Sequence, residues 1–350
     1  MFKEEYVGNL HVHTLYSDGG ATTQEIAGKA AEVGLDFICL NDHAHMTDAL
    51  HLSDEGFYGK VLMMVGLEMG VRYHHYLAYD IREREGRHNL SAQEIIDTVH
   101  SQGGFGFLAH PFEKGMPFAE KSVAYTWNDL SVTGYSGLCI WNFTSRWKER
   151  VKTILHGFFF LAFKTRMLKG PSRETLTFWD QQCQKRRVVA VGGSDAHGTA
   201  FKWGHLRLTP FTYDYLLHSI TIHVLLKNKL SKTLPEAKQE IYEAMRSGRL
   251  FIVHENLSPA RGFRFDFASS DGSDLYMGEE ASFRPGQFVV ELPAEGRIRL
   301  IKDGALVEER RGKEAIFSVT EKGVYRVEVY KHVFLFGWRP WIFSNPIYLR

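Results

Sequence analysis

Short apolar runs alternate with amphipathic stretches through the first 255 residues of the chain. Two of the stretches, Thr23–Val33 and Ser91–Gln102, have helical spacing and open with a Thr/Ser-x-x-Glu pattern typical of a helix start. Apolar runs separated by helices are typical of parallel β/α units, and without a G-x-G-x-x-G motif we expect a barrel. The runs are Asp36–Leu40, Val61–Leu67, Tyr76–Tyr79, Phe105–Ala109, Leu138–Trp141 and Val188–Val191.

The pattern changes near Pro235. Leu234–Ser247 has the spacing of one more helix, which ends at Gly248. From about Asn256 onward, short segments of alternating apolar and polar residues are separated by turn signals rich in Asp, Gly and Ser. This pattern predicts a small antiparallel β-sandwich over residues 256–350, following a barrel over residues 1–255.

Composition and charge describe an ordinary folded protein. The 350 residues include 42 Lys and Arg against 41 Asp and Glu, and the net charge of +1 excludes a globally basic nucleic-acid binder. Cys39, Cys139 and Cys183 follow no C-x-x-C spacing, so the sequence predicts neither a disulfide framework nor a thiolate zinc site. Because Met1–Tyr6 also lacks the apolar run of a secretory signal, we expect a cytoplasmic protein.

One segment, residues 144–187, departs from this charge balance. It carries 11 basic residues against three acids, a local net charge of +8, and its residues 151–163 have amphipathic helical spacing. The apolar centre, Gly157–Phe163, is far shorter than the roughly 20 residues that span a bilayer. Three interpretations stay open: a helix buried against the barrel, a lid over the active site that attracts an anionic substrate, or contact of residues 151–166 with an anionic membrane surface.

Histidine is the most informative residue type, with 17 copies. Histidines and carboxylates stand at the ends of the predicted strands, and the carboxyl ends of parallel barrel strands converge on one mouth. Imidazole and carboxylate without thiolate suit Zn, Mn or Fe, and nine such side chains exceed what one ion can bind. The sequence therefore predicts a cluster of two or three divalent metal ions. The candidate ligands are His11, His13, Asp18, His43, Glu68, His75, His110, Asp195 and His197.

Four basic residues are candidates for binding a small anionic substrate: Lys114, Arg146, Lys202 and His205. For each of them an ordinary surface role is the alternative. A nucleic-acid substrate is not favoured, because no aromatic-rich binding motif accompanies the basic segment. The sequence does not indicate an oligomeric state.

The order of the candidate ligands resembles the PHP (polymerase and histidinol phosphatase) domain family. Its signature blocks are H-x-H, a D-H pair, a strand-end Glu, a His before Pro and a final D-x-H, and all are present in roughly residues 1–255. The resemblance implies a distorted (β/α)7 barrel with a trinuclear site. It implies one ion bound by His11, His13, Glu68 and Asp195, a second by Glu68, His75 and His110, and a third by Asp18, His43 and His197.

At two positions the resemblance to the family requires an interpretation. His74 precedes His75, but the sequence from His75 onward is more similar to the family's block of His followed by apolar residues. Asp18 stands where some relatives have His, which favours the phosphoesterase branch of the family over the histidinol phosphatases. The blocks WNFTSRWKE, FKWGHLR and SNPIYL are similar to a subgroup that includes carbamate-ester hydrolases.

These observations predict a metal-dependent hydrolase in which the ions provide hydroxide from bound water. A phosphoester is the expected substrate, and no catalytic side chain is predicted beyond the metal cluster. The first alternative is a carboxylic or carbamic ester hydrolase with the same cluster. The second alternative is a non-catalytic PHP module that binds metal and serves as an interaction platform.

Overall fold

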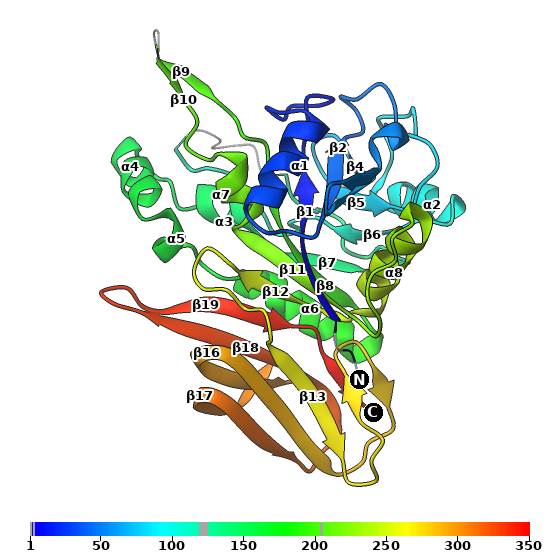
Figure 1. Cartoon of the computed structure of the whole chain (residues 1–350), viewed down its shortest axis with the longest axis vertical. Helices are drawn as coiled ribbons and strands as arrows, with labels where there is room; N and C mark the ends of the chain where they lie inside the picture. Colours follow the sequence, from blue (N-terminus) through cyan, green and yellow to red (C-terminus); the bar gives the residue numbers. More distant parts are fainter. Residues whose placement is uncertain (1, 3, 119–124, 204–205) are drawn as a thin grey trace.

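The computed structural model describes residues 2, 4–118, 125–203 and 206–350, with the side chains of 201–208 left out. Helices are interspersed among the strands up to helix α8, and after it the described elements are strands (Figure 1). The helices are α1 (Thr23–Glu32), α2 (Ala92–Ser101), α3 (Phe143–Lys148), α4 (Ile154–Ala162), α5 (Lys164–Met167), α6 (Arg173–Lys185), α7 (Tyr213–Leu217) and α8 (Leu234–Ser247), with the 3-10 turn η1 (Leu52–Asp54).

Within the described residues, seven strands close into a barrel. Strand β5 runs antiparallel to its neighbours β4 and β6, whereas the other neighbouring pairs are parallel. The predicted closed barrel is confirmed, and the exact (β/α)7 repeat stays a prediction. The strands are β1 (Glu4–Val12), β2 (Phe37–His43), β4 (Val61–Met69), β5 (Tyr76–Tyr79), β6 (Phe105–Leu108), β7 (Gly137–Asn142) and β8 (Val189–Ala196).

The predicted strands, helix starts and helix end agree with the structure. Each of the predicted strand runs overlaps a barrel strand. Reciprocal hydrogen bonds join Thr22 and Glu25 in front of α1, and Ser91 and Glu94 do the same for α2. Helix α8 ends at Gly248, whose φ of 74° is a left-handed conformation that glycine adopts without steric cost.

Among the strands that the sequence patterns miss are β11 (Ile220–Leu226) and β12 (Leu250–His254). Strand β11 pairs antiparallel with β1, β12 pairs with β11, and β12 also pairs with β19 (Gly337–Ser344). One hydrogen-bonded sheet therefore runs from the barrel into the C-terminal strands. The boundary between residues 1–255 and 256–350 stays a prediction.

The C-terminal part is built around the long strand β16 (Gly286–Lys302), which pairs antiparallel with β13, β17 and β18. Strand β15 pairs in parallel with β20, so the pairing is mostly but not entirely antiparallel. A β-sandwich stays a prediction. The remaining strands are β3 (Gly56–Tyr58), β9 (Phe201–Trp203), β10 (Leu206–Leu208), β13 (Arg264–Ser269), β14 (Leu275–Tyr276), β15 (Glu280–Ala281), β17 (Ala305–Val319), β18 (Gly323–Val333) and β20 (Ile347–Leu349).

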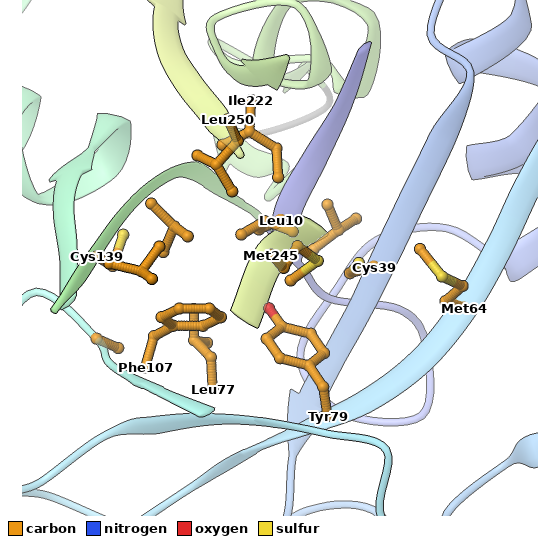
Figure 2. Close-up of a cluster of buried hydrophobic side chains, with 14 of the residues drawn as sticks. Leu10, Cys39, Met64, Leu77, Tyr79, Phe107, Cys139, Ile222, Met245 and Leu250 are labelled. Carbon is orange, nitrogen blue, oxygen red and sulfur yellow. The ribbon is translucent and has the colours of Figure 1, made fainter. Parts of the chain in front are cut away.

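Two hydrophobic cores form among the described residues. Figure 2 shows part of the larger core, where Leu10, Leu77 and Phe107 come from β1, β5 and β6 and gather with Met245 of α8. The smaller core lies among the C-terminal strands around Phe288. Because the larger core fills the space between the barrel strands at close packing, it fixes the positions of the strand ends.

Helix α4 is an exception to this packing. None of its residues is buried, although its sequence is almost entirely apolar. For α4, the interpretation of the basic segment 144–187 as a helix buried against the barrel is therefore wrong. No described helix has the length and apolar character needed to cross a bilayer.

Candidate metal centre

All nine candidate ligands lie together at one mouth of the barrel. They come from the carboxyl ends of parallel strands, as the barrel geometry predicts, and Asp18 comes from the loop after β1. His75 precedes β5, and because β5 is reversed its first residue lies at the same mouth as the other strand ends. The reversed strand therefore brings His75 to the cluster.

The backbone at the mouth is locally irregular. The pairing of β1 with β2 and β8 shifts register before Val12, which is the pattern of a β-bulge. His11 lies at this bulge with a φ of 67°, and His110 and Asp195 also have positive φ, 29° and 56°. Such conformations are uncommon for residues other than glycine and often mark functional sites.

Glu68 is the centre of the cluster and is only 1% exposed. Its Oε2 atom lies 3.0 Å from Nε2 of His11 and 3.1 Å from Nδ1 of His43. Its Oε1 atom lies 2.8 Å from Nδ1 of His75 and 3.3 Å from Nε2 of His110. Both carboxylate oxygens thus face imidazoles from different strands, which suits a carboxylate shared between two cations.

Two aspartates bring in the remaining histidines. The Oδ1 atom of Asp18 lies 3.2 Å from Nε2 of His197 and 3.7 Å from Nε2 of His43. The Oδ1 atom of Asp195 lies 3.4 Å from Nε2 of His13. In the described residues, four overlapping groups have ligand atoms within 4.8 Å of one another: His13, Asp18, His43 and His197; His11, His110 and Asp195; His11, His13 and Glu68; and His43, Glu68 and His75.

Several of these buried imidazole nitrogens have no hydrogen-bond partner among the described residues. They are Nε2 of His11, both ring nitrogens of His13, and Nδ1 of His43. Each lies near a carboxylate oxygen without the geometry of a hydrogen bond. Buried polar groups are normally satisfied, and a cation between imidazole and carboxylate would satisfy both. The residues therefore fit a metal cluster.

The cluster perturbs the ionisation of its own members. Burial, with the nearby His197 and His43, lowers the pKa of His13 to about 3. Burial likewise lowers the pKa of His43 to about 4, although Glu68 opposes this shift. Neutral imidazole is the form that binds metal ions, so these two side chains are in the ligand form at neutral pH.

The pKa is raised instead for the two histidines whose surroundings are dominated by carboxylates. Burial opposes protonation of His110, but Glu113 and Glu68 outweigh it and raise its pKa to about 9. Burial also opposes protonation of His197, but Asp18 and Asp195 together outweigh it and raise its pKa to about 9. A cation that binds to His110 or His197 must therefore displace a proton from that imidazole.

A cavity of about 220 Å³ opens onto the cluster. Its lining includes residues that the sequence analysis did not single out: Glu113, Tyr125, Thr144 and Lys148. Lys148 is 8% exposed, and its Nζ atom lies 2.6 Å from Oε1 of Glu113. The only sequence signal for Lys148 is its place in the basic segment, where ten other cations compete for the same interpretation.

The predicted substrate-binding residues lie elsewhere or outside the described side chains. Lys114 is half-exposed and pairs with Glu174 on the surface. Arg146 pairs with Glu149 and donates to the carbonyl of Gly170, and neither Lys114 nor Arg146 lines the cavity. Two more predicted substrate-binding residues lie outside what is described: the side chain of Lys202, and the whole of His205.

Comparison with known proteins agrees with this geometry. The family model of the PHP domain matches residues 9–258, which is most of the chain. A search among curated proteins gives no match.

Two solved structures are similar at low sequence identity. One is a two-domain protein containing a predicted PHP-like metal-dependent phosphoesterase from Bacteroides vulgatus ATCC 8482, 14% identical, with a TM-score of 0.48, covering 98% of this chain and 95% of that one. The other is a candidate metal-dependent phosphoesterase from Bifidobacterium adolescentis ATCC 15703, 15% identical, with a TM-score of 0.34, covering 57% of this chain and 91% of that one.

Proposed function

This chain belongs to the PHP domain family, and we propose that it is a hydrolase that uses two or three divalent metal ions to cleave a small anionic phosphoester. The observation that carries the proposal is the set of buried imidazole nitrogens that face carboxylate oxygens without hydrogen bonds. Such a set is costly to bury unless a ligand completes it.

We assign the ligands as the family resemblance implies. His11, His13, Glu68 and Asp195 would bind one ion; Glu68, His75 and His110 a second; and Asp18, His43 and His197 a third. Zn, Mn or Fe bound there would activate water and neutralise negative charge on the substrate. The donor set of imidazole and carboxylate suits each of these metals.

Residues around the cluster have supporting roles. The side-chain nitrogen of Asn142 lies 3.4 Å from Nδ1 of His11 and from Oδ2 of Asp195, so it restrains both side chains. Nδ1 of His110 lies 2.8 Å from the carbonyl oxygen of Tyr125, which turns Nε2 of His110 toward Glu68. Such outer contacts orient ligands and fix the imidazole tautomer.

Lys148 is the residue that we assign to substrate binding. It is the lysine among the described residues that line the cavity at the cluster, and its ammonium group pairs with Glu113. An ammonium at this position would bind a phosphoryl or carboxylate oxygen by a charge-assisted hydrogen bond. Its pairing with Glu113 would position it before the substrate arrives.

The same observation supports a second candidate function. A phosphoesterase pocket is expected to offer several cations, whereas the described part of this lining offers Lys148 with its charge already balanced by Glu113. A carboxylic or carbamic ester needs less positive charge. A hydrolase for such esters, with the same metal cluster, is therefore the alternative.

One experiment separates these possibilities. Metal content of the purified full chain is measured together with hydrolysis of p-nitrophenyl phosphate, bis-p-nitrophenyl phosphate and p-nitrophenyl acetate, with added Mn²⁺ or Zn²⁺. We expect two to three ions per chain and phosphoester turnover that is lost in His13→Ala. The surface variant Lys114→Met is the control and should keep both properties.

Other outcomes would change the assignment. Turnover of the acetate alone would favour the carboxylic or carbamic ester hydrolase. Bound metal with no turnover of any ester would favour the non-catalytic interaction module. Absence of bound metal from the wild-type chain, even after reconstitution, would contradict the proposal.

A further inference from the structure

Large apolar side chains are exposed on two segments that are distant in sequence. On α4, Leu155 is 75% exposed and Phe158 is 59% exposed. In the turn between β18 and β19, Phe334 is 79% exposed and Leu335 is 84% exposed. We call these side chains the apolar face, with the further members Ile154 and Phe159 on α4, which are 59% and 47% exposed.

The two segments lie side by side. The ring of Phe163, directly after α4, is 5.4 Å from the ring of Phe336 in the β18–β19 turn. The guanidinium of Arg166 lies 5.9 Å from the same ring of Phe336. Figure 1 shows α4 and the tip of β18 and β19 at the same edge of the molecule, both extending away from its body. The apolar face therefore extends over two neighbouring segments that project from the body of the molecule.

Basic residues flank both segments of the apolar face. Lys152, Arg166 and Lys169 are exposed around α4, and the sequence from residue 150 to 170 contains no acid. The sequence from residue 331 to 340 also contains no acid, while Lys331 and Arg339 flank its turn. A partner that covers this surface must accept both the apolar side chains and the basic residues that flank them.

We propose that the apolar face docks the protein on an anionic lipid bilayer. Folded proteins rarely leave so many large apolar side chains exposed together unless something covers them. An apolar surface with a basic rim fits the boundary between headgroups and acyl chains, where Phe and Leu enter the lipid and Lys and Arg meet lipid phosphates.

The geometry argues against the other occupants. A second copy of this chain in a two-fold contact would bring two basic rims together, which is repulsive. A bound peptide helix would need an apolar groove, whereas this surface projects outward. Docking of this kind is peripheral, in agreement with the absence of a described helix that could cross the bilayer.

The test is co-sedimentation of the full chain with vesicles of phosphatidylcholine alone or mixed with phosphatidylserine. We expect binding to the mixed vesicles, weak binding to phosphatidylcholine alone, and weaker binding as salt is raised. The double variant Leu155→Glu/Phe158→Glu should bind the mixed vesicles at least ~tenfold more weakly, because two apolar groups no longer enter the lipid.

Ile316→Glu is the matched control, because Ile316 on β17 is 59% exposed, as Phe158 is, but lies outside the apolar face. It should bind vesicles as the wild type does. The proposal is wrong if the wild type does not bind the mixed vesicles, or if the double variant binds as tightly as Ile316→Glu. It is also wrong if light scattering shows that the wild type is a dimer which the double variant separates, since the apolar face would then contact a second copy.

Discussion

The barrel mouth and the contact between α6 and β18 both bury several charged groups, but the groups are satisfied differently. At the contact, Arg326 is 3% exposed, and its guanidinium donates to both oxygens of Asp180 and to Glu328. Glu328 also accepts from Tyr330 and Arg299. At the mouth, by contrast, imidazole nitrogens face carboxylates without hydrogen bonds.

The difference shows how a structural cluster can be told from a binding cluster. A buried ion pair whose donors and acceptors match one another needs no further group. A cluster with many acceptors and few matched donors needs a ligand to complete it. We therefore expect changes at the Arg326 cluster to alter stability, and changes at the mouth to alter metal binding and turnover.

The largest expected effect is on turnover at the mouth. Asp195→Ala should lower kcat/KM for the hydrolysed ester by on the order of 10³-fold or more, since the metal cluster loses a carboxylate that faces both His11 and His13. Steady-state kinetics and metal analysis measure the two losses. Circular dichroism should show the wild-type fold, and a variant with full activity would contradict the assigned site.

The next effect is on stability at the other cluster. Arg326→Met should lower the free energy of unfolding by about 3–5 kcal/mol, because Asp180 and Glu328 lose their buried partner. Urea denaturation measures this change. Metal content and kcat should stay at wild-type values, and loss of metal in this variant would remove the distinction between the clusters.

A smaller effect is expected for the substrate at the mouth. Lys148→Met should raise KM about 10- to 100-fold with little change in metal content, since the substrate loses a charge-assisted hydrogen bond. The double variant Lys148→Met/Glu113→Gln keeps the charge of the pair neutral and should show the same KM. Lys114→Met is the surface control, and an equal rise in its KM would argue against a specific role for Lys148.

The smallest effect concerns a second matched cluster, in which His223 lies between Glu5 and Glu255 at 2.7 and 3.3 Å. Burial opposes protonation, but the two carboxylates outweigh it and raise the pKa of His223. The stability that this pairing contributes is therefore complete below the unfolded pKa of about 6.5 and is lost as the pH rises through the folded pKa.

His223→Gln should remove this part of the pH dependence. Urea denaturation of both proteins from about pH 6 to pH 9 measures it, and the two unfolding free energies should converge at the upper end. Parallel curves for variant and wild type would show that His223 does not titrate in this range. Ester hydrolysis should be unaffected, as expected for a matched cluster.

The barrel and the convergence of the nine candidate ligands could be predicted from the sequence because both depend on where the apolar runs end. Glu68 and Asp195 are charged residues at the ends of buried apolar runs, and barrel geometry brings such strand ends together. The choice of His75 over His74 came from the family resemblance, and the reversal of β5 that brings His75 to the mouth is visible only in the pairing of the strands.

Other features depend on contacts that a linear pattern does not contain. The strand Ile220–Leu226 includes Thr221 and His223 among its apolar residues, so its run is less distinct than the others. Lys148 is one of many cations in its segment, and its burial follows from its pairing with Glu113. Helix α4 is exposed although its sequence is mostly apolar, whereas an apolar sequence normally indicates burial.

The left-handed backbone conformation at the mouth lowers stability at residues that are needed for activity. His11, His110 and Asp195 hold positive φ values that cost roughly 1–2 kcal/mol for a residue with a side chain. Glycine would adopt the same backbone at no such cost but would contribute no ligand. Selection of variants for thermal tolerance alone would therefore tend to remove the residues on which turnover depends, so a selection of that kind needs a parallel screen for hydrolysis.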